Sequence, residues 1–511
     1  MLARVLSSSV LGVEAYQVEV EVDTARGLPQ FNLVGLPEGA VKESKERVKS
    51  AIRNSGYEYP AGRITVNLAP ADIRKEGSAF DLPIAVGLLI AEGALQSARI
   101  QDYLILGELS LDGRLKPVRG GLPIAILARN SGQRGLVLPS SNAREAAIVD
   151  GIDVLGVDHL SEVFEFFNSD REISPVRVDV TELFSRHSVY EVDFNEVRGQ
   201  EQAKRAMEVA AAGGHNLLMV GPPGSGKTML AKRLPTVLPR LSLEEAIQTT
   251  KVYSVAGLLS SQSAIVATRP FRSPHHTISD AGLVGGGTIP RPGEVSLAHN
   301  GVLFLDELPE FTRNVLEVLR QPIEDGKVTI SRALSSLTYP ADFMLVGAMN
   351  PCPCGYLGDP AHSCHCTPLQ IQRYRSRVSG PLLDRIDIQV EVPAVRWQEL
   401  AQESGGEASA EIGARVELAR KVQEDRFSRA KIFCNAQMGS RMIRKYCQPE
   451  KDGERLLQLA VDKLGMSARG YTRVLKVART IADLEGSATI HSSHVSEAIQ
   501  YRSLDRLTEQ G

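Results

Sequence analysis

The chain has 511 residues, a formal net charge of −3 and 43% hydrophobic residues. A chain of this length is too long for one hydrophobic core, so we expect two to four domains. The small net charge excludes a strongly basic protein that coats nucleic acid, so any contact to a polyanion has to come from local basic loops. The chain start lacks a secretory signal and no apolar run reaches 18 residues, which predicts a soluble cytoplasmic protein without membrane contact.

The first 170 residues predict a small α/β domain. Apolar residues alternate with polar ones, or form short runs, at four predicted strands: residues 16–22, 63–68, 102–109 and 136–138. Residues 42–55 have the spacing of an amphipathic helix that stops at Gly56. Residues 171–196 are polar and mixed and contain Pro175, which indicates a linker to the next domain.

A complete phosphate-binding loop of the form G-x-x-x-x-G-K-[ST] lies near the middle of the chain. Its members are Gly221, Pro222, Pro223, Gly224, Ser225, Gly226, Lys227 and Thr228. An apolar run at 216–220 predicts a buried strand before this P-loop, and residues 229–234 predict a helix after it. In this arrangement Lys227 reaches the β- and γ-phosphates and the Thr228 hydroxyl holds Mg²⁺. The loop therefore predicts binding of a nucleoside triphosphate, with ATP and Mg²⁺ as the expected cofactors.

Two further apolar runs end in polar side chains. The run at 302–305 is followed by Asp306 and Glu307. A buried strand here places Asp306 close to the Mg²⁺ of the P-loop, and Glu307 where it polarises the attacking water. The run at 343–349 ends in Asn350, whose amide can orient the water or sense the γ-phosphate.

An arginine follows about 35 residues later, in the segment Leu-Leu-Asp-Arg-Ile-Asp. This residue, Arg385, is placed where an arginine can reach the γ-phosphate as an arginine finger, usually from a neighbouring subunit. A salt bridge with Asp384 or Asp387 is the structural alternative.

The chain is nearly all helical in pattern from about residue 395 onward. Residues 403–409 are rich in glycine and serine and indicate a flexible joint within this region. Arg469 and Arg473 open a basic amphipathic helix, and one of them can close the nucleotide pocket from a helical lid.

Four of the six cysteines lie within 15 residues, in the pattern C-x-C, nine residues, C-x-C: Cys352, Cys354, Cys364 and Cys366. Reduced thiols this close suit a tetrahedral Zn²⁺ held by four thiolates, with His362 and His365 as substitute ligands. Unpaired reduced thiols and redox chemistry are the alternatives. The cluster begins two residues after Asn350, so loss of a metal there would disturb hydrolysis.

The set and order of these motifs resemble the AAA+ superfamily. Five segments narrow the resemblance to its Mg-chelatase-like branch, and within it to the YifB/ComM family: residues 273–277 (SPHHT), 282–287 (GLVGGG), 305–310 (LDELPE), 350–355 (NPCPCG) and 380–387 (GPLLDRID). The resemblance covers essentially the whole chain. It implies a ring ATPase, typically a homo-hexamer, in which Arg385 acts in trans and Arg469, ahead of Arg473, is the lid sensor. It also implies DNA as the partner and a helicase that promotes branch migration in recombination during natural transformation.

Two inserted loops are expected to contact the DNA. Residues 282–300, which include Arg291, resemble the helix-2 insertion of the related MCM-type helicases. Residues 327–331 and 337–339 predict a hairpin with Arg332 near its tip. In ring helicases of this branch both loops point into the pore, where a few arginines per subunit make a basic channel even when the net charge is negative. Contact between subunits is the alternative role.

The N-terminal domain resembles the proteolytic domain of Lon-type proteases around residues 107–122. That family uses a Ser-Lys dyad, and this chain has Pro123 at the position of the lysine and Ala79 at that of the serine, with Ser78 one residue off. A proline cannot serve as a general base. We therefore predict a Lon-like fold without peptidase activity that serves ring assembly or DNA contact.

Together these patterns predict an α/β protein with four parts. They are a Lon-like domain (ribosomal S5 domain 2-like) at 1–170, a linker at 171–196, a P-loop NTPase core of the AAA+ type at 197–395 with the cysteine insert at 352–366, and a helical lid at 396–511. Two other functions stay open. One is a Mg-chelatase-like motor that remodels a protein partner, and the other is an ATP-dependent protease, against which Pro123 argues.

Overall fold

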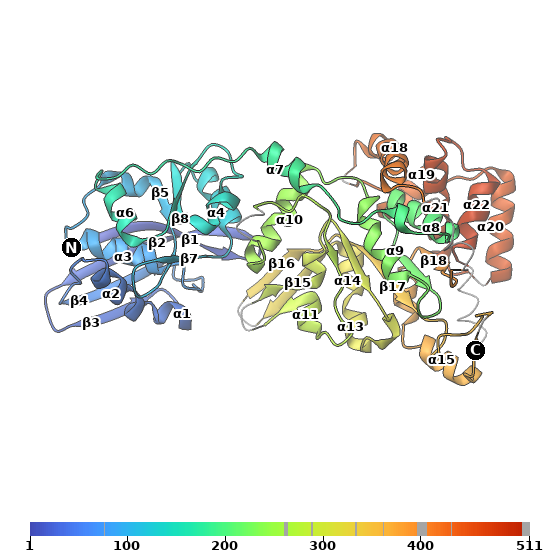
Figure 1. Ribbon diagram of the computed structural model, residues 1–511, viewed down its shortest axis with the longest axis horizontal. Coiled ribbons are helices and arrows are strands. Elements are labelled where there is room, and N and C mark those ends of the chain that lie inside the picture. Colours follow the sequence, from blue (N-terminus) through green and yellow to red (C-terminus); the bar gives the residue numbers. More distant parts are fainter. Residues whose placement is uncertain are drawn as a thin grey trace. The chain divides into compact units, whose positions relative to one another are not determined.

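The computed structural model describes residues 1–75, 77–259, 264–287, 290–332, 335–360, 362–395, 406–430, 432–464 and 466–502. These residues divide into two compact units (Figure 1). The N-terminal unit consists of Met1–Ser188 with the described residues of Leu243–Ala267 and Ala333–Tyr339. The C-terminal unit consists of the described residues of Val189–Ser242, Thr268–Arg332 and Pro340–Gly511.

Two sheets form the framework of the N-terminal unit. The first has the order β1-β2-β4-β3, from β1 (Leu2–Leu11), β2 (Glu14–Ala25), β4 (Arg63–Ala69) and β3 (Gln30–Val34), and only its β3–β4 pair is parallel. The second is parallel, with the order β5 (Tyr103–Ile105), β8 (Gly135–Pro139) and β9 (Asp153–Val157). A short ribbon pairs β6 (Glu108–Leu109) with β7 (Leu115–Lys116). The helices are α1 (Gly39–Lys42), α2 (Ser44–Asn54), α3 (Asp81–Ala91), α4 (Gly121–Asn130), α5 (Ser140–Ala146), α6 (Leu160–Phe167), α7 (Val180–His187) and α10 (Leu243–Ala256), with a 3-10 turn at Ala98–Asp102.

Most of the elements predicted in this unit are present. The strands expected at 16–22 and 63–68 lie in β2 and β4, the helix expected at 42–55 is α2, and the strand expected at 102–109 is divided into β5 and β6. Strand β1 was not predicted because three consecutive serines interrupt its apolar pattern. Ser7 and Ser8 are nevertheless buried in the sheet.

Helix α3 packs on the first sheet of this unit and is buried along almost its whole length. Gly87 permits the close approach, because a Cβ there would lie 2.6 Å from Cγ2 of Val22. The helix starts at Asp81, which is fully buried and accepts a hydrogen bond of 2.6 Å from Nε of Arg47 on α2. Burial outweighs this ion pair and raises the pKa of Asp81 to about 6.

Helix α10 follows the P-loop segment in sequence but packs against α4 within the N-terminal unit. The backbone N–H of Gly120 donates to the carbonyl oxygen of Ser254 over 3.2 Å. Nζ of Lys251 lies 3.0 Å from Oε1 of Glu14. Part of the sequence between the P-loop and Asp306 therefore belongs to the N-terminal unit.

A five-stranded parallel sheet is the centre of the C-terminal unit (Figure 1). Its order is β11 (Phe271–Arg272), β14 (Val302–Leu305), β17 (Met344–Met349), β10 (Leu217–Val220) and β18 (Ile388–Glu391). All four strand pairs are parallel, so the carboxyl ends of β10, β17 and β14 meet at one edge. The three strands predicted around residues 216–220, 302–305 and 343–349 are these three neighbours.

Shorter elements surround this sheet. The helices are α8 (Glu201–Gly213), α9 (Lys227–Arg233), α11 (Asp280–Val284), α12 (Glu294–Leu297), α13 (Arg313–Val318), α14 (Arg320–Asp325), α15 (Pro368–Arg375) and α16 (Gly380–Leu383), and 3-10 turns lie at Phe194–Glu196, Leu234–Thr236 and Leu308–Glu310. Strands β12 (Gly285–Gly286) and β13 (Arg291–Pro292) pair; β15 (Lys327–Arg332) and β16 (Ser335–Pro340) form a separate two-stranded sheet, in which residues 335–339 are counted with the N-terminal unit. The second pair is the predicted hairpin, and residues 333–334 between its strands lie outside the described part.

The described residues from 406 to 502 are mainly helical, as predicted. Their helices are α18 (Ser409–Phe427), α19 (Ser440–Tyr446), α20 (Lys451–Leu464), α21 (Ala468–Leu484) and α22 (Ser492–Gln500), with a 3-10 turn at Asn435–Gln437. Apolar residues of α18, α21 and α22 share one buried cluster with α8 and the sheet. None of the described helices has the length and hydrophobicity needed to span a bilayer.

Candidate active site

The P-loop has the backbone that its glycines predict. It connects the end of β10 to the start of α9, and Gly224 and Gly226 adopt φ values of 75° and 85° in the left-handed region. Such values favour glycine because it has no Cβ. The loop's first residue, Gly221, also needs to be glycine, since a Cβ there would lie 2.0 Å from the carbonyl oxygen of Val392.

The ammonium group of Lys227 lies over the loop. Nζ donates to the carbonyl oxygens of Gly221 and Pro222 over 2.7 and 2.8 Å, and it lies 3.4 Å from Oδ1 of Asn350. Burial lowers the pKa of Lys227, while the carboxylates of Asp306 and Glu307 oppose this shift. The predicted phosphate-binding lysine and the amide at the end of β17 are therefore neighbours.

Thr228 and Asp306 meet across the edge of the sheet. The Thr228 hydroxyl donates to Oδ2 of Asp306 over 2.6 Å, although the two residues are 78 positions apart. A hydroxyl and a carboxylate oxygen are the protein ligands that Mg²⁺ takes at P-loops. The geometry thus fits the magnesium site that the sequence predicts.

Glu307 has a strained backbone and an exposed side chain. Its φ of 51° lies in the left-handed region, and its backbone N–H donates to Oδ1 of Asp306 over 3.0 Å. Its carboxylate is 59% exposed and lies 3.5 Å from Nδ1 of His276. A non-glycine residue held in this conformation is uncommon outside turns and functional sites.

Sequence reasoning assigned no role to two residues at this site. His276 follows β11 and faces Glu307, and the segment SPHHT that contains it was noted only as part of a resemblance. Gln200 lies just before α8 with a φ of 59°, and its side-chain amide donates to the carbonyl oxygen of Ser225 in the P-loop. A Gly-Gln pair ahead of a helix was the available signal for Gln200.

Arg385 is buried, with 5% of its surface exposed. Its guanidinium pairs with Oε1 of Glu324 over 2.5 Å and donates to the carbonyl oxygen of Pro381 over 2.6 Å. The ion-pair partner is thus Glu324 on α14, and neither Asp384 nor Asp387, which the sequence offered as the alternative. Action on a γ-phosphate in trans would require this pair to open.

The two lid arginines differ in their surroundings. Arg473 forms an ion pair with buried Asp387 and donates to the carbonyl oxygen of Arg385 over 3.2 Å. Burial alone would raise the pKa of Asp387, but the charge of Arg473 and the polar contact with His215 outweigh it and hold this pKa well below its usual range. Arg469, one turn earlier on α21, is exposed.

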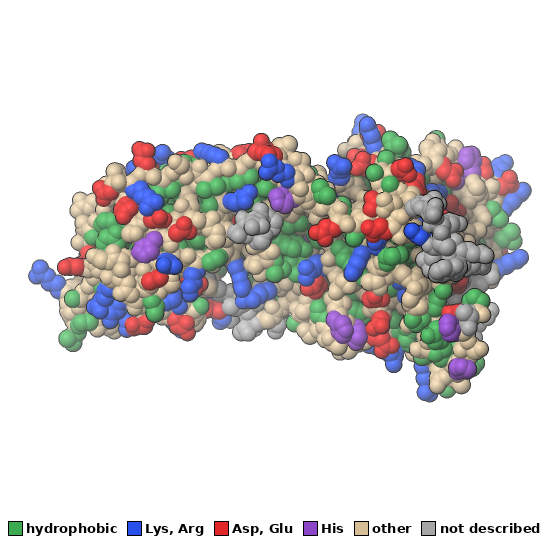
Figure 2. All heavy atoms as spheres, in the orientation of Figure 1, with side chains coloured by type: hydrophobic (Ala, Val, Ile, Leu, Met, Phe, Trp, Pro, Cys, Tyr) green, Lys and Arg blue, Asp and Glu red, His purple; other side chains and the backbone are tan. Residues whose placement is uncertain are grey.

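The two arginines expected to contact DNA lie on short strands. Arg291 is exposed in β13, opposite Gly286. Arg332 is the last residue of β15, and its side chain lies outside the described part. On the face drawn in Figure 2, basic and acidic side chains are interspersed over the described residues.

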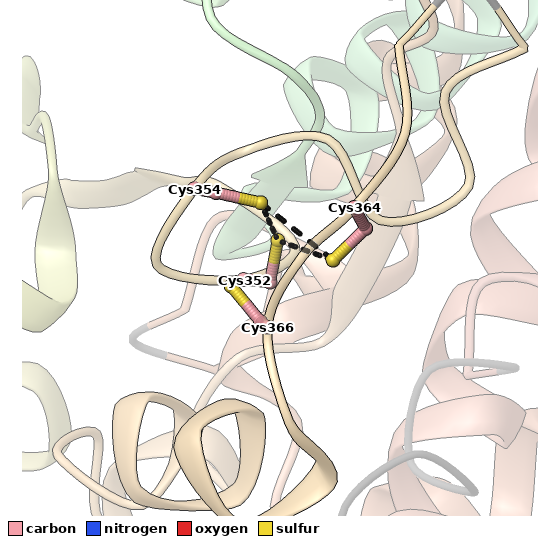
Figure 3. A group of neighbouring side chains, drawn as sticks. All are labelled: Cys352, Cys354, Cys364 and Cys366. Atoms are coloured by element: carbon pink, nitrogen blue, oxygen red, sulfur yellow. Dashed lines mark hydrogen bonds between the residues drawn. The ribbon is translucent and has the colours of Figure 1, made fainter.

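The four predicted cysteines converge (Figure 3). The Sγ atom of Cys352 lies 3.3 Å from Sγ of Cys354 and 3.7 Å from Sγ of Cys364. The Sγ atoms of Cys354 and Cys364 are 3.6 Å apart. With Cys366 included, all four sulfur atoms lie within 4.8 Å of one another. A tetrahedral zinc with Zn–S bonds of about 2.3 Å requires sulfur separations of about 3.8 Å, so the cluster fits a Zn²⁺ ion.

One of the two histidines considered as substitute ligands, His362, has other neighbours. Nδ1 of His362 lies 3.4 Å from the carboxylate of Asp359, and its ring lies 4.7 Å from the ring of Tyr356 between centroids, with the two planes tilted by 32°. The four-thiolate set is therefore the one that the geometry favours.

The region that resembles a peptidase site has no general base at the expected position. Pro123 is buried in the first turn of α4, where the dyad lysine of Lon-type proteases would be. The Ser78 hydroxyl donates to the carboxylate of Glu108, which lies 3.7 Å from Lys116. Among the described residues no lysine or histidine contacts this hydroxyl.

The sheet order and the site together define a P-loop ATPase of the AAA+ class. Family comparison agrees, since the family described as "Magnesium chelatase, subunit ChlI" matches residues 193–400. "Subunit ChlI of Mg-chelatase" matches residues 20–142, and "Magnesium chelatase, subunit ChlI C-terminal" matches residues 406–502. Membership in this family implies a nucleotide-hydrolysing enzyme that uses ATP and Mg²⁺.

Curated relatives narrow the class further. The chain is 46% identical to protein YifB of Escherichia coli over 508 residues, 99% of this chain and 98% of that protein. It is also 46% identical to competence protein ComM of Haemophilus influenzae over 517 residues, 100% of this chain and 99% of that protein. A shorter match, 32% identical over 189 residues, covers 31% of this chain and 33% of Lon protease 2 of Bacillus subtilis. The chain belongs to the YifB/ComM family of Mg-chelatase-like AAA+ ATPases.

Proposed function

We propose that this protein is an ATP-driven, hexameric DNA helicase that promotes branch migration in homologous recombination during natural transformation. The observation that carries the proposal is an assembled ATP site within a chain that matches competence protein ComM along its whole length. The proposed location is the cytoplasm, where imported DNA meets the chromosome.

In this proposal the ATP site is shared between subunits. Lys227 and the P-loop backbone bind the phosphates, Thr228 and Asp306 hold Mg²⁺, and Glu307 polarises the attacking water. The short distance between Thr228 and Asp306 supports this assignment. Arg385 of the next subunit, released from its own Glu324, would neutralise the γ-phosphate in the transition state.

The rest of the site completes the proposal. Asn350 senses the γ-phosphate, for which its position beside Lys227 is the support. Arg469 is the better candidate for the lid sensor, since it is exposed whereas Arg473 is engaged by Asp387. We also propose the division into a Lon-like domain, linker, ATPase core and lid at the boundaries predicted above, with α10 as a segment of the core that packs in the N-terminal unit.

DNA contact is proposed for Arg291 and Arg332 in the ring channel. Charges of both signs are interspersed on the face in Figure 2, so its described residues form no large basic docking surface. A few arginines repeated around a ring provide the local positive charge that a phosphate backbone requires. Contact between subunits remains the alternative role for both loops.

A remodelling motor that acts on a protein partner is the second candidate. The matches to magnesium chelatase subunit ChlI favour it. An ATP-dependent protease is disfavoured, because Pro123 occupies the position of the dyad lysine and the Ser78 hydroxyl, among the described residues, donates to the carboxylate of Glu108 rather than to a general base.

The decisive experiment measures ATP hydrolysis with and without DNA and then displacement on a synthetic four-way junction. Lys227→Ala serves as the matched inactive ring, and light scattering with nucleotide present establishes the oligomeric state. Stimulation by DNA together with ATP-dependent junction separation is the expected result. A fully assembled ring that hydrolyses ATP, ignores DNA and leaves the junction intact would refute the helicase in favour of the remodelling motor.

A further inference from the structure

The cysteine cluster closes a loop that has little else to order it. Residues 350–367 contain no helix or strand among their described members, and only Pro351, Cys352 and Gly355 are buried. Loops of this length without secondary structure are uncommon in compact domains unless they are functional or tied by a cross-link. The thiols are not joined as disulfides, and their sulfur separations match the edges of a zinc tetrahedron.

One end of this loop is continuous with the ATP site. Cys352 follows Asn350 by two residues, and Oδ1 of Asn350 lies 3.4 Å from Nζ of Lys227. The carbonyl oxygen of Pro351, between them, accepts hydrogen bonds of 3.2 and 3.0 Å from the guanidinium of Arg375. Burial raises the pKa of Tyr374 to about 12, and the nearby backbone of Asn350 opposes this shift.

Tyr374 and Arg375 belong to α15, which is joined to the other end of the loop. This helix begins at Pro368, directly after Cys366 and its capping residue Thr367. A helix of eight residues is not stable by itself in water, so its position depends on what holds its ends. A metal that ties Cys364 and Cys366 to Cys352 therefore fixes α15 relative to Asn350.

The loop also packs directly on the P-loop. Gly355, with a φ of 87°, lies so close to Pro223 that a Cβ would be 2.5 Å from the Pro223 Cδ atom. No residue with a side chain fits this contact without displacement of the P-loop. The backbone at Gly355, which directly follows Cys354, therefore packs against the P-loop at Pro223.

We propose that a Zn²⁺ ion held by Cys352, Cys354, Cys364 and Cys366 is a positioning element of the ATP site, which sets Asn350 and the P-loop for hydrolysis. The metal acts through α15 and through the contact of Gly355 with Pro223, and it does not touch the nucleotide. Its loss lowers kcat more than it lowers nucleotide affinity, because the P-loop backbone and Lys227 remain able to bind phosphate. This inference rests on the ATPase part of the proposed function and is independent of DNA.

The first test is the metal content of the full-length protein, purified with zinc in the growth medium. One zinc per chain is expected for the wild type and for Cys447→Ala, a buried cysteine outside the cluster. Cys354→Ser and Cys366→Ser should lose the metal and, without DNA, hydrolyse ATP about 10- to 100-fold more slowly, the scale of a misplacement of about 1 Å. Their affinity for a fluorescent ATP analogue should stay within about threefold of wild type, because nucleotide binding by the P-loop depends less on the position of Asn350 than hydrolysis does.

Two further measurements keep the test decisive if the serine variants fold poorly. Chelation of wild-type protein should remove the zinc and the activity together, and Zn²⁺ should restore both; Co²⁺ in its place should give thiolate-to-metal absorption. Arg375→Gln should keep one zinc per chain and the nucleotide affinity but lower kcat. Zinc-free purified protein, an unchanged kcat after the metal is removed, or a wild-type kcat for Arg375→Gln would each overturn the proposal. Failure of DNA stimulation would leave these readouts unaffected and would bear only on the helicase.

Discussion

Arg473→Met should markedly destabilise the C-terminal unit. Arg473 on α21 pairs with Asp387, which precedes β18 and is 4% exposed. The carboxylate would keep its hydrogen bond from the backbone N–H of Asn216, but His215 beside it is fully buried, and burial lowers the pKa of His215 and so disfavours the charged imidazolium that could replace Arg473. The remaining cation is Lys476, which donates to the carbonyl oxygen of Ala436. The substitution therefore leaves a buried charge without a full partner.

The magnitude follows from this burial. Removal of one partner from a buried ion pair costs roughly 3–5 kcal/mol, and the lower end applies because the Arg473 side chain is 21% exposed. Because this unit has more than 250 residues, each kcal/mol shifts the melting temperature by about 2 °C at most, so a cost of about 3 kcal/mol predicts a fall of about 5 °C.

The assay is thermal unfolding of the full-length protein without nucleotide. Arg469→Met is the matched control, because it removes the same charge from the same helix at an exposed position and should cost no more than about 0.5 kcal/mol. The double variant Arg473→Met, Asp387→Asn should lose less than the sum of the two single losses. Equal, small shifts for Arg473→Met and Arg469→Met would refute the reasoning.

Four other outcomes are expected. Lys227→Ala and Arg385→Ala should each abolish ATP hydrolysis, and Arg385→Ala should keep most of its nucleotide binding. Mixed rings that contain both variants should regain activity if Arg385 acts in trans. No recovery in mixed rings would argue against a site shared between subunits. Glu307→Gln should bind ATP but release phosphate at least about 100-fold more slowly, and near-normal turnover would exclude it as the residue that polarises water. Arg332→Ala should spare basal hydrolysis and reduce its stimulation by DNA; undiminished stimulation contradicts the channel assignment. The free energy of unfolding of the wild-type N-terminal unit, measured relative to Asp81→Asn, should fall by roughly 3 kcal/mol as the pH rises from about 4 to about 7. The folded pKa of Asp81 is raised to about 6, so the protonated carboxyl stabilises the folded state fully only below the pKa of the unfolded chain, and this stabilisation is lost as the pH rises through about 6. A pH-independent difference between the two proteins in denaturant or hydrogen-exchange stability would contradict this.

The phosphate-binding half of the site was predictable because its signals are local. Glycine spacing determines where the backbone can turn into the left-handed region, and a short apolar run before it predicts a buried strand. The same logic located Asp306 and Asn350 at strand ends. Gln200 and His276 were missed, since each reaches the site from a separate segment and no local pattern states what it will face.

The sequence by itself determined the P-loop, the strands that carry Asp306 and Asn350, and the pattern of the four cysteines, because these depend on neighbours along the chain. Tertiary structure alone decided that β17 lies between β10 and β14, and so that Thr228 touches Asp306 and Lys227 lies beside Asn350. It also decided that Arg385 pairs with Glu324 rather than with an adjacent aspartate. The physical reason is that ion pairs and metal coordination depend on distances through space. The path of the folded chain determines these distances, and the spacing of residues along the sequence does not.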